Sequence, residues 1–340
     1  MHQLTPSVLI MGYGKIGKIK AQIWKRCGVD VSIYDNTKMC MENAQADGFS
    51  IEKAPFHIAY NFVDICTPSS THIEVLKKII LDGVKFDRVV IEKPLFNNIQ
   101  EKKTLYELLD NDTSLHKKIV VNEQYYRSKA IKVLQETLLK DKIKYIEITM
   151  SKNRKTDNQN GRFIDSDIGV YGIELPHILA ILEMLGKPVD VMKLVKNVLF
   201  VDSNDKNNQG IIMEYVTKND TKVVINSFLG DFKISPANKI SDNKAIDRSL
   251  WIKGDGFAHS VILDPHPSKE HLLTELNWGS ESTLIRDDML TENISSIISG
   301  NIAHGCKLEY AIKHSKQAIS LFNNANVIKI KKEDNYVHNS

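Results

Sequence analysis

The sequence has little that would place it among secreted, metal-binding or membrane-spanning proteins. Only four of its 340 residues are cysteine, and no two stand at C-x-x-C spacing, so reduced thiols are expected rather than disulfides or a zinc site. None of the eleven histidines forms an H-x-x-x-H or H-E-x-x-H pair, and no metal is predicted. No apolar run approaches the roughly 18 residues that cross a bilayer, and no secretion signal precedes the first predicted strand. These absences favour a cytoplasmic protein.

An excess of one charge is also lacking. The 45 Lys and Arg residues oppose 42 Asp and Glu residues, for a formal net charge of +3, and the two signs are interspersed. Neither nucleic acid nor a membrane surface is therefore predicted as a partner. The length exceeds the usual range of a single domain and predicts two.

The N-terminal segment carries a pattern typical of dinucleotide binding. Residues 7–11 are mostly apolar and predict a buried strand, and three glycines follow at G-x-G-x-x-G spacing before a predicted helix over 18–27. Gly12 permits the tight turn, Gly14 lets the backbone approach a pyrophosphate, and Gly17 allows helix and strand to pack closely. The diphosphate is expected at the positive N-terminus of the helix.

Two further features refine the predicted cofactor site. Lys15 and Ile16 lie between the glycines and are expected to contact the cofactor. Asp35 ends the next predicted strand, 31–35, where it can accept hydrogen bonds from an adenosine ribose but would repel a 2′-phosphate. This favours NAD over NADP, although Lys38 could partly offset the repulsion. The alternative interpretation of Asp35 is a turn residue or helix cap.

Strands and helices alternate after Asp35, which predicts an α/β fold with a doubly wound parallel sheet. This part is expected to contain helices over 37–46, 73–81 and 99–110 and strands over 62–66, 88–91 and 118–121. The N-terminal Rossmann domain is predicted to cover residues 1–126.

A different pattern begins near residue 127. Alternating apolar runs, with hairpin signals at 218–221 and 254–256, predict a mostly antiparallel open sheet. Its strands are expected over 144–150, 191–202, 210–217, 221–228, 248–253 and 257–263, and its helices over 129–140, 176–185, 283–299 and 307–324, ahead of a charged tail. An α+β domain is therefore predicted over 127–340.

Glu92-Lys93-Pro94 is the second landmark, because it follows directly on an apolar strand, where open parallel sheets place ligand chemistry. Pro94 restricts the residue before it and so fixes the direction of Lys93. A partly desolvated lysine beside an oxidised nicotinamide is a candidate acid/base for a hydroxyl proton. The residues alone leave a plain surface Glu-Lys pair equally open.

Four segments together resemble one enzyme family. GYGKIG, CTPSSTH, IEKPL and VNEQYYR, at residues 12–17, 66–72, 91–95 and 121–127, are similar to the glucose-fructose oxidoreductase and inositol dehydrogenase family, written Gfo/Idh/MocA. The resemblance covers the first 130 or so residues. In the second domain it rests on the order of elements and the region around His177.

The resemblance implies roles for these segments. It places Lys93 beside the nicotinamide and the substrate hydroxyl, and it places Thr67, Pro68, His72 and Glu92 on the cofactor side. For His72 the alternative is a capping residue at the start of a helix. The resemblance also implies that the second domain binds substrate and forms homodimers or homotetramers through the outer face of its sheet, for which 210–217 and 221–228 are the most apolar candidates.

A third group of candidate site residues runs from Asp167 to His177. The family commonly has an aspartate and a histidine four residues apart here, followed by an apolar helix ending in Leu-Gly, but this chain has Tyr171 four residues after Asp167. Either Tyr171 replaces the family histidine, or His177 is that histidine with Glu174 near the acid's usual place. Spacing to Gly186 favours His177. All four side chains are candidate site residues; a core histidine and a packed tyrosine are the alternatives.

Further candidates lie in the linking segments. Arg162, and with it Arg154, could bind a substrate phosphate or carboxylate, while Tyr126 begins the crossing into the second domain. We expect an NAD-dependent oxidoreductase that acts on a ring hydroxyl of a sugar, modified sugar or cyclitol, with Lys93 and His177 catalytic. Other proteins of the family and fold that this chain resembles leave three alternative functions open: an NAD-using glycosidase, an imine or carbonyl reductase, and a non-catalytic NAD-sensing regulator.

Overall fold

The computed structural model divides into two units. It describes residues 5–54, 58–138, 142–155, 159, 167–190, 193–235, 238–243, 246–263, 266, 271–331 and 337. The first unit comprises Met1–Glu123 and Leu290–Ser315, and the second comprises Gln124–Met289 and Lys316–Ser340. Residues 290–315 therefore pack with the N-terminal unit, although they lie far from it in sequence.

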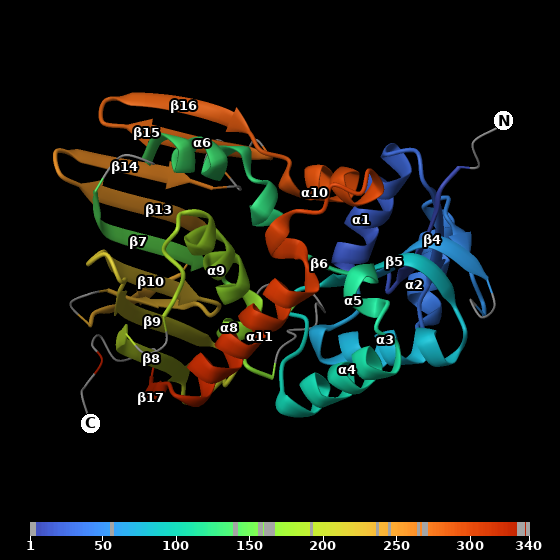
Figure 1. The fold of residues 1–340 in the computed structure, drawn as a ribbon. Coiled ribbons are helices and arrows are strands. Elements are labelled where there is room, and N and C mark those ends of the chain that lie inside the picture. Colours follow the sequence, from blue (N-terminus) through green and yellow to red (C-terminus); the bar gives the residue numbers. More distant parts are fainter. Residues whose placement is uncertain are drawn as a thin grey trace. The chain divides into compact units, whose positions relative to one another are not determined.

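A parallel sheet forms the centre of the first unit (Figure 1). Its described strands are β1 (Ser7–Met11), β2 (Asp30–Tyr34), β3 (Ser50–Ile51), β4 (Ala59–Ile65), β5 (Lys85–Glu92) and β6 (Ile119–Asn122). They pair in the order β3-β2-β1-β4-β5-β6, and every pairing is parallel. The order reverses between β1 and β4, so the predicted doubly wound sheet is confirmed, with its switch point at the glycine-rich turn.

Helices connect these strands. They are α1 (Lys15–Arg26), α2 (Lys38–Ala46), α3 (His72–Leu81), α4 (Ile99–Asn111) and α5 (Leu115–Lys118). Because crossovers between parallel strands are right-handed, the reversal of strand order puts α1 and α2 on one face of the sheet and α3 and α4 on the other. The helix α10 (Met289–Ile298) joins this unit: Arg88 donates to the carbonyl of Ile297, and Asn293 donates to Asn122.

The second unit is built on a large mixed sheet. Its described strands are β7 (Ile143–Ser151), β8 (Leu194–Asp202), β9 (Gln209–Val216), β10 (Lys222–Phe228), β13 (Asp247–Gly254), β14 (Phe257–Ile262), β15 (Leu273–Trp278), β16 (Glu281–Arg286) and β17 (Asn326–Ile330). They pair in the order β16-β15-β14-β13-β7-β10-β9-β8-β17. The pairs β7–β10 and β8–β17 are parallel and the others antiparallel, which confirms the predicted mostly antiparallel sheet.

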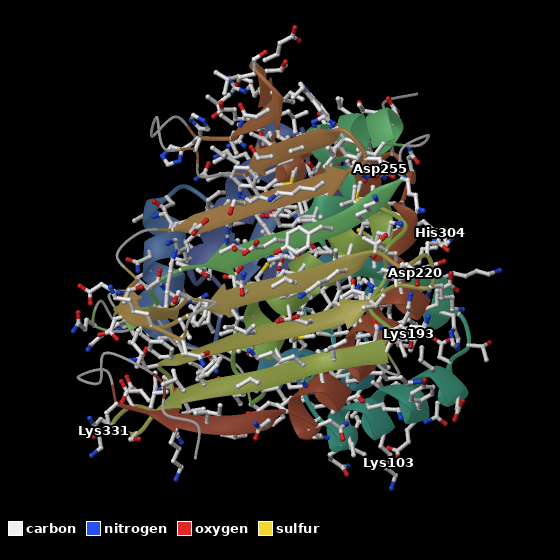
Figure 2. The ribbon with its side chains drawn as sticks, turned by 90° about the vertical axis from the view of Figure 1, so that its left-hand side faces the viewer. Lys103, Lys193, Asp220, Asp255, His304 and Lys331 are labelled. Carbon is white, nitrogen blue, oxygen red and sulfur yellow. The ribbon has the colours of Figure 1, made fainter. Side chains whose placement is uncertain are left out.

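Helices cover one face of this sheet (Figure 1). They are α6 (Lys129–Thr137), α8 (Val170–Ile173), α9 (Leu175–Met184) and, from Lys316 onward, α11 (Leu308–Asn323). The main core lies between these helices and inward residues such as Ile146, Ile148 and Ile225. Figure 2 looks onto the opposite face, where the hairpin β11 (Phe232–Ile234) and β12 (Ile240–Asp242) covers a second, smaller apolar cluster.

Two expectations for the C-terminal part were wrong. The predicted helix 283–299 begins only at Met289, because residues 281–286 form β16 in antiparallel register with β15. The β-branched Thr283 and Ile285 suit a strand, and Ile285 packs toward the core while Leu284 is exposed. The expected charged tail also contains a strand, because Asn326–Ile330 pairs with β8. The two predicted hairpins are confirmed, with Asp220 and Gly256 at positive φ.

Candidate active site

The carboxyl ends of the first unit's strands bring its predicted site residues to one edge. Met11 pairs with Tyr34 and Ile65, Ile65 pairs with Ile91, and Ile91 pairs with Val121. The residues that follow these positions therefore emerge side by side; they include Gly12, Asp35, Thr67, Lys93 and Asn122. This is the edge where doubly wound sheets bind dinucleotides.

Each glycine of the turn has a different reason to be glycine. Gly12 has φ of 99°, and a Cβ there would lie 3.0 Å from the Thr67 side chain. A Cβ on Gly17 would overlap the carbonyl oxygen of Gly12, so helix and strand could not pack as they do. Gly14, at the N-cap of α1, has open space where its Cβ would be. These features fit a diphosphate at the start of α1, whose first two residues are Lys15 and Ile16.

Asp35 is engaged by the backbone of two loops. Its Oδ2 accepts from the N–H of Tyr13 at 2.8 Å, and its Oδ1 accepts from the N–H of Thr37 at 2.8 Å. The carboxylate thus ties the glycine turn to the end of β2, as a turn residue would. It is still half-exposed, and a carboxylate has about four acceptor positions, so it keeps capacity for a ribose hydroxyl.

His72 connects two of the predicted cofactor-side turns. Its ring is buried, with Nδ1 2.9 Å from the carbonyl oxygen of Pro94 and Nε2 3.0 Å from that of Thr67. The Thr67 hydroxyl also accepts from Thr71, while Pro68 is exposed. His72 therefore holds the Thr67 turn against the turn that follows β5.

Lys93 directly follows β5, and its side chain is half-buried. The Lys93–Pro94 peptide bond is cis. The side chain of the preceding residue, Glu92, is directed into the unit, where its Oε1 accepts from Asn122 Nδ2 at 2.6 Å. The strand end that carries the candidate acid/base is thus connected to the end of β6.

Sequence reasoning missed a buried charge beneath this edge. Lys20 is fully buried, and its Nζ lies 2.6 Å from Asp64 Oδ1 and 2.7 Å from Glu92 Oε1. Burial opposes its positive charge, but the carboxylates of Asp64 and Glu92 outweigh that effect and raise the pKa of Lys20 above its usual value. The signal that could have found it is its place on α1, on the same helix side as Gly17, Ala21 and Trp24.

In the second unit, His177 lies in the first turn of α9. Its side chain is mostly buried, and its ring packs edge-on against Tyr125 with centroids 5.1 Å apart. Glu174, at the N-cap, is buried, with Oε2 3.6 Å from an Nη atom of Arg248 on β13. The structure therefore brings Glu174 and His177 to one helix start, next to Tyr125, and adds Arg248, which sequence reasoning did not assign.

The other predicted residues of this unit lie in different surroundings. Tyr171 is fully buried, donates to Asn197 Oδ1 at 2.6 Å and packs against Phe322; burial raises the pKa of its hydroxyl. Tyr171 thus faces the core, and Asp167 is exposed. Tyr126 donates to Glu183 at 2.6 Å. Arg162 lies outside the described residues, and Arg154 is mostly buried.

The comparisons with known proteins agree with this geometry. A model of an oxidoreductase family with an NAD-binding Rossmann fold, Gfo/Idh/MocA, matches residues 7–121. The chain carries the NAD-binding domain of a Gfo/Idh/MocA oxidoreductase. The family resemblance drawn from the four sequence segments is therefore confirmed over these residues, and it supports an NAD(P)-dependent dehydrogenase or reductase. No curated protein matches the chain.

Solved structures extend the likeness in fold over the second unit of the chain. UDP-N-acetylglucosamine 3-dehydrogenase GnnA from Acidithiobacillus ferrooxidans is 16% identical, with a TM-score of 0.66 over 95% of this chain and 98% of that one. KijD10, a 3-ketoreductase from Actinomadura kijaniata in complex with NADP and TDP-benzene, is 14% identical, with a TM-score of 0.72 over 96% and 99%. At these identities the likeness establishes the fold.

Two features are absent from the described residues. No group of three or more His, Cys, Asp or Glu side chains in that part of the chain is arranged to hold a metal ion. Within the same residues, no helix has both the length and the apolarity needed to cross a membrane.

Proposed function

We propose that this Gfo/Idh/MocA protein transfers a hydride between a nicotinamide cofactor and a ring carbon of a sugar, a modified or nucleotide-linked sugar, or a cyclitol. One observation carries the proposal. The parallel register brings the glycine turn, Asp35, Thr67 and Lys93 to the same edge of one sheet, so the cofactor-binding residues and a candidate acid/base come together through backbone pairing alone.

Lys93 is proposed to manage the substrate proton. The bound nicotinamide supplies the hydride acceptor or donor. When the alcohol is oxidised, the Lys93 amine takes the hydroxyl proton as the hydride leaves the carbon, and in reduction the ammonium returns it.

The second unit is proposed to supply the substrate contacts. His177 and Glu174 lie at one helix start, and a buried carboxylate near an imidazole can fix the orientation of that ring. We assign His177 to a substrate hydroxyl and Glu174 to positioning, with Arg248 compensating the buried charge of Glu174. Tyr171 is assigned to the core, because its hydroxyl is already bonded to Asn197.

NAD is the proposed cofactor, and a nucleotide-linked sugar is the first substrate to try. The carboxylate of Asp35 is half-exposed at the end of β2, where a 2′-phosphate would meet a like charge. The complex of KijD10 contains NADP, so the proposed preference for NAD is argued from Asp35 of the present chain alone.

The names of GnnA and KijD10 refer to a UDP-linked sugar and to a TDP compound.

The experiment is a substrate panel read by absorbance of the reduced cofactor. UDP-N-acetylglucosamine, a TDP-linked hexose, free hexoses and cyclitols are each added with NAD to wild type, Lys93→Met and the control Lys85→Met. Lys85 lies at the opposite end of the same strand and is exposed. We expect kcat to fall about 10² to 10⁴-fold in Lys93→Met only. Full turnover by folded Lys93→Met would refute the assignment.

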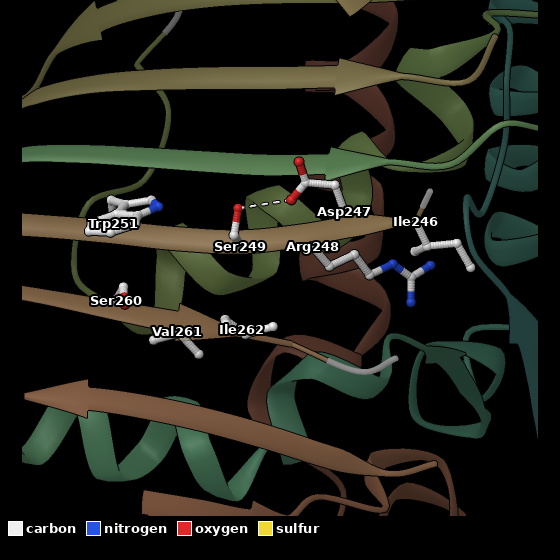
Figure 3. Close-up of a pocket in the computed structure, with 8 residues that line it drawn as sticks. All are labelled: Ile246, Asp247, Arg248, Ser249, Trp251, Ser260, Val261 and Ile262. Atoms are coloured by element: carbon white, nitrogen blue, oxygen red, sulfur yellow. Dashed lines mark hydrogen bonds between the residues drawn. The ribbon is translucent and has the colours of Figure 1, made fainter. Parts of the chain in front are cut away.

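Oligomerisation is proposed to use the face of the second unit's sheet that lies opposite its helices. The segments 210–217 and 221–228 are apolar because both of their faces are buried: Ile212 and Phe228 lie under the hairpin, and the alternating residues lie in the main core. Trp251 on β13 remains 48% exposed beside a hollow of about 260 Å³ (Figure 3). Sedimentation velocity of the full chain tests the proposal, which a monomer at micromolar concentration would contradict.

A further inference from the structure

The proposed chemistry leaves a fully buried ammonium, that of Lys20, without a role. Lys20 donates from Nζ to Asp64 Oδ1 at 2.6 Å and to Glu92 Oε1 at 2.7 Å. Removing an ammonium from water costs several kcal/mol unless close partners compensate it. Two carboxylates compensate the charge of Lys20, and Asp64 is itself fixed by the indole N–H of Trp24 at 2.7 Å.

The partners of Lys20 belong to the elements that build the cofactor edge. Lys20 lies on α1, the helix that begins at the glycine turn. Asp64 lies on β4, three residues before Thr67, and Glu92 is the last residue of β5, directly before Lys93. A single ammonium therefore joins the glycine-turn helix to β4 and β5, the strands that precede Thr67 and Lys93.

Glu92 is held from a second direction as well. The same oxygen, Oε1, accepts from Asn122 Nδ2 at 2.6 Å, and Asn122 Oδ1 in turn accepts from Asn293 Nδ2 at 2.6 Å. Successive side chains of an extended strand point to opposite sides. With the carboxylate of Glu92 held by two donors on one side, the backbone from which Lys93 departs has little freedom to rotate.

A contribution to stability alone does not account for this network. Replacing a buried ion pair with apolar residues of similar volume is often neutral or stabilising, and here one ammonium serves two carboxylates. We propose that Lys20 is a positioning residue that acts through Glu92 to hold the amine of Lys93 in the geometry for proton transfer. The inference rests on the proposed function of Lys93. In this proposal the side chain of Glu92 fixes the turn that carries Lys93 and does not contact the cofactor.

The test separates folding from turnover with a charge-balanced variant. Lys20→Met alone leaves two buried carboxylates uncompensated, whereas Lys20→Met/Asp64→Asn removes one charge of each sign and keeps an acceptor for Trp24. Lys25→Met, an exposed position on the same helix, is the control. Tm, NADH affinity by nicotinamide fluorescence, and kcat and KM for the best substrate of the panel are measured for the full chain. We expect the double variant to fold and to bind NADH within threefold of wild type, with kcat at least thirtyfold lower and KM within threefold. A kcat within threefold of wild type would overturn the inference.

A second pair of variants decides the matter if the double variant does not fold. Glu92→Gln and Glu92→Ala both keep the Lys20–Asp64 pair. The amide oxygen of Gln can still accept from Lys20 and Asn122, so kcat is expected to stay within fivefold of wild type. In Glu92→Ala it is expected to fall at least thirtyfold. Equal kcat values for the two variants would overturn the positioning role.

The outcome is distinguishable from failure of the proposed function. An inactive Lys93→Met together with active Lys20→Met/Asp64→Asn and Glu92→Ala variants removes only this inference. Full turnover by Lys93→Met removes the acid/base role and the inference that depends on it.

Discussion

The carboxyl edge of the parallel sheet and the start of α9 are assembled by different means. At the sheet edge, backbone pairing sets the position of each candidate residue, because neighbouring strand ends lie in register. At α9, Glu174 meets Arg248 from β13, and His177 meets Tyr125 from a separate segment. A local motif is therefore enough to locate the first set, whereas the second depends on side chains that are brought together only by the tertiary fold.

The largest expected effect tests the backbone-built region. In Gly17→Ala the new methyl overlaps the Gly12 carbonyl oxygen, so α1 must shift from β1. We expect a stability loss of about 1–3 kcal/mol and NADH affinity reduced by more than about a hundredfold, equivalent to about 2.7 kcal/mol. Denaturant unfolding and nicotinamide fluorescence measure the two effects.

Gly14→Ala is the matched control for folding. Its methyl enters open space, so unfolding should be unchanged, yet NADH affinity should fall about tenfold or more, because that space is where the diphosphate is expected. Unaltered NADH binding by Gly14→Ala would contradict the assignment of the turn.

The next effect tests the side-chain-built region. His177→Asn should lower kcat about a hundredfold or more, as loss of a proton-handling group does, while Tm stays close to wild type.

Tyr171→Phe should do the reverse: loss of the bond to Asn197 costs about 1–2 kcal/mol of unfolding free energy, with kcat within about twofold. A folded but inactive Tyr171→Phe would restore Tyr171 to the substrate site.

The smallest effect concerns the choice of cofactor. Asp35→Asn removes a negative charge but keeps one oxygen to accept from the backbone N–H of Tyr13 or Thr37. We expect the ratio of NADPH to NADH affinity to rise about tenfold, since one charge repulsion of about 1.4 kcal/mol is relieved. Competitive titration of the two reduced cofactors measures this ratio, and an unchanged ratio would show that Asp35 does not select against the phosphate.

Much of the first unit could be predicted because its signals are local. The three glycines, the acid at the end of β2 and the lysine after β5 each stand beside an apolar strand. The parallel register of these strands then brings the residues to one edge of the sheet. Lys20 escaped prediction because a lysine on a helix usually faces solvent. Its spacing from Gly17, Ala21 and Trp24 indicates the buried side of the helix, but its partners lie 44 and 72 residues away in sequence and no neighbouring residue identifies them.

The second unit was predictable as a sheet but not as a site. The hairpin signals at 218–221 and 254–256 located four strands correctly. The same apolar character that marked 210–217 and 221–228 as strands did not reveal that both faces are buried. The pairing of Glu174 with Arg248 depends on the position of β13 beside β7, which no nearby residue specifies.

The late segment 290–315 gives the first unit an unusual order of synthesis. The strand β6 is at the edge of its sheet, and the residues that contact it there are made much later: Lys307 bridges Val120, and Asn293 follows its partner Asn122 by 171 residues. At 5–20 residues per second, that interval lasts roughly ten to thirty seconds. Throughout it, the nascent Rossmann sheet has an unpaired edge open to other strands. The segment 290–315 therefore completes a unit whose other residues are synthesised before it.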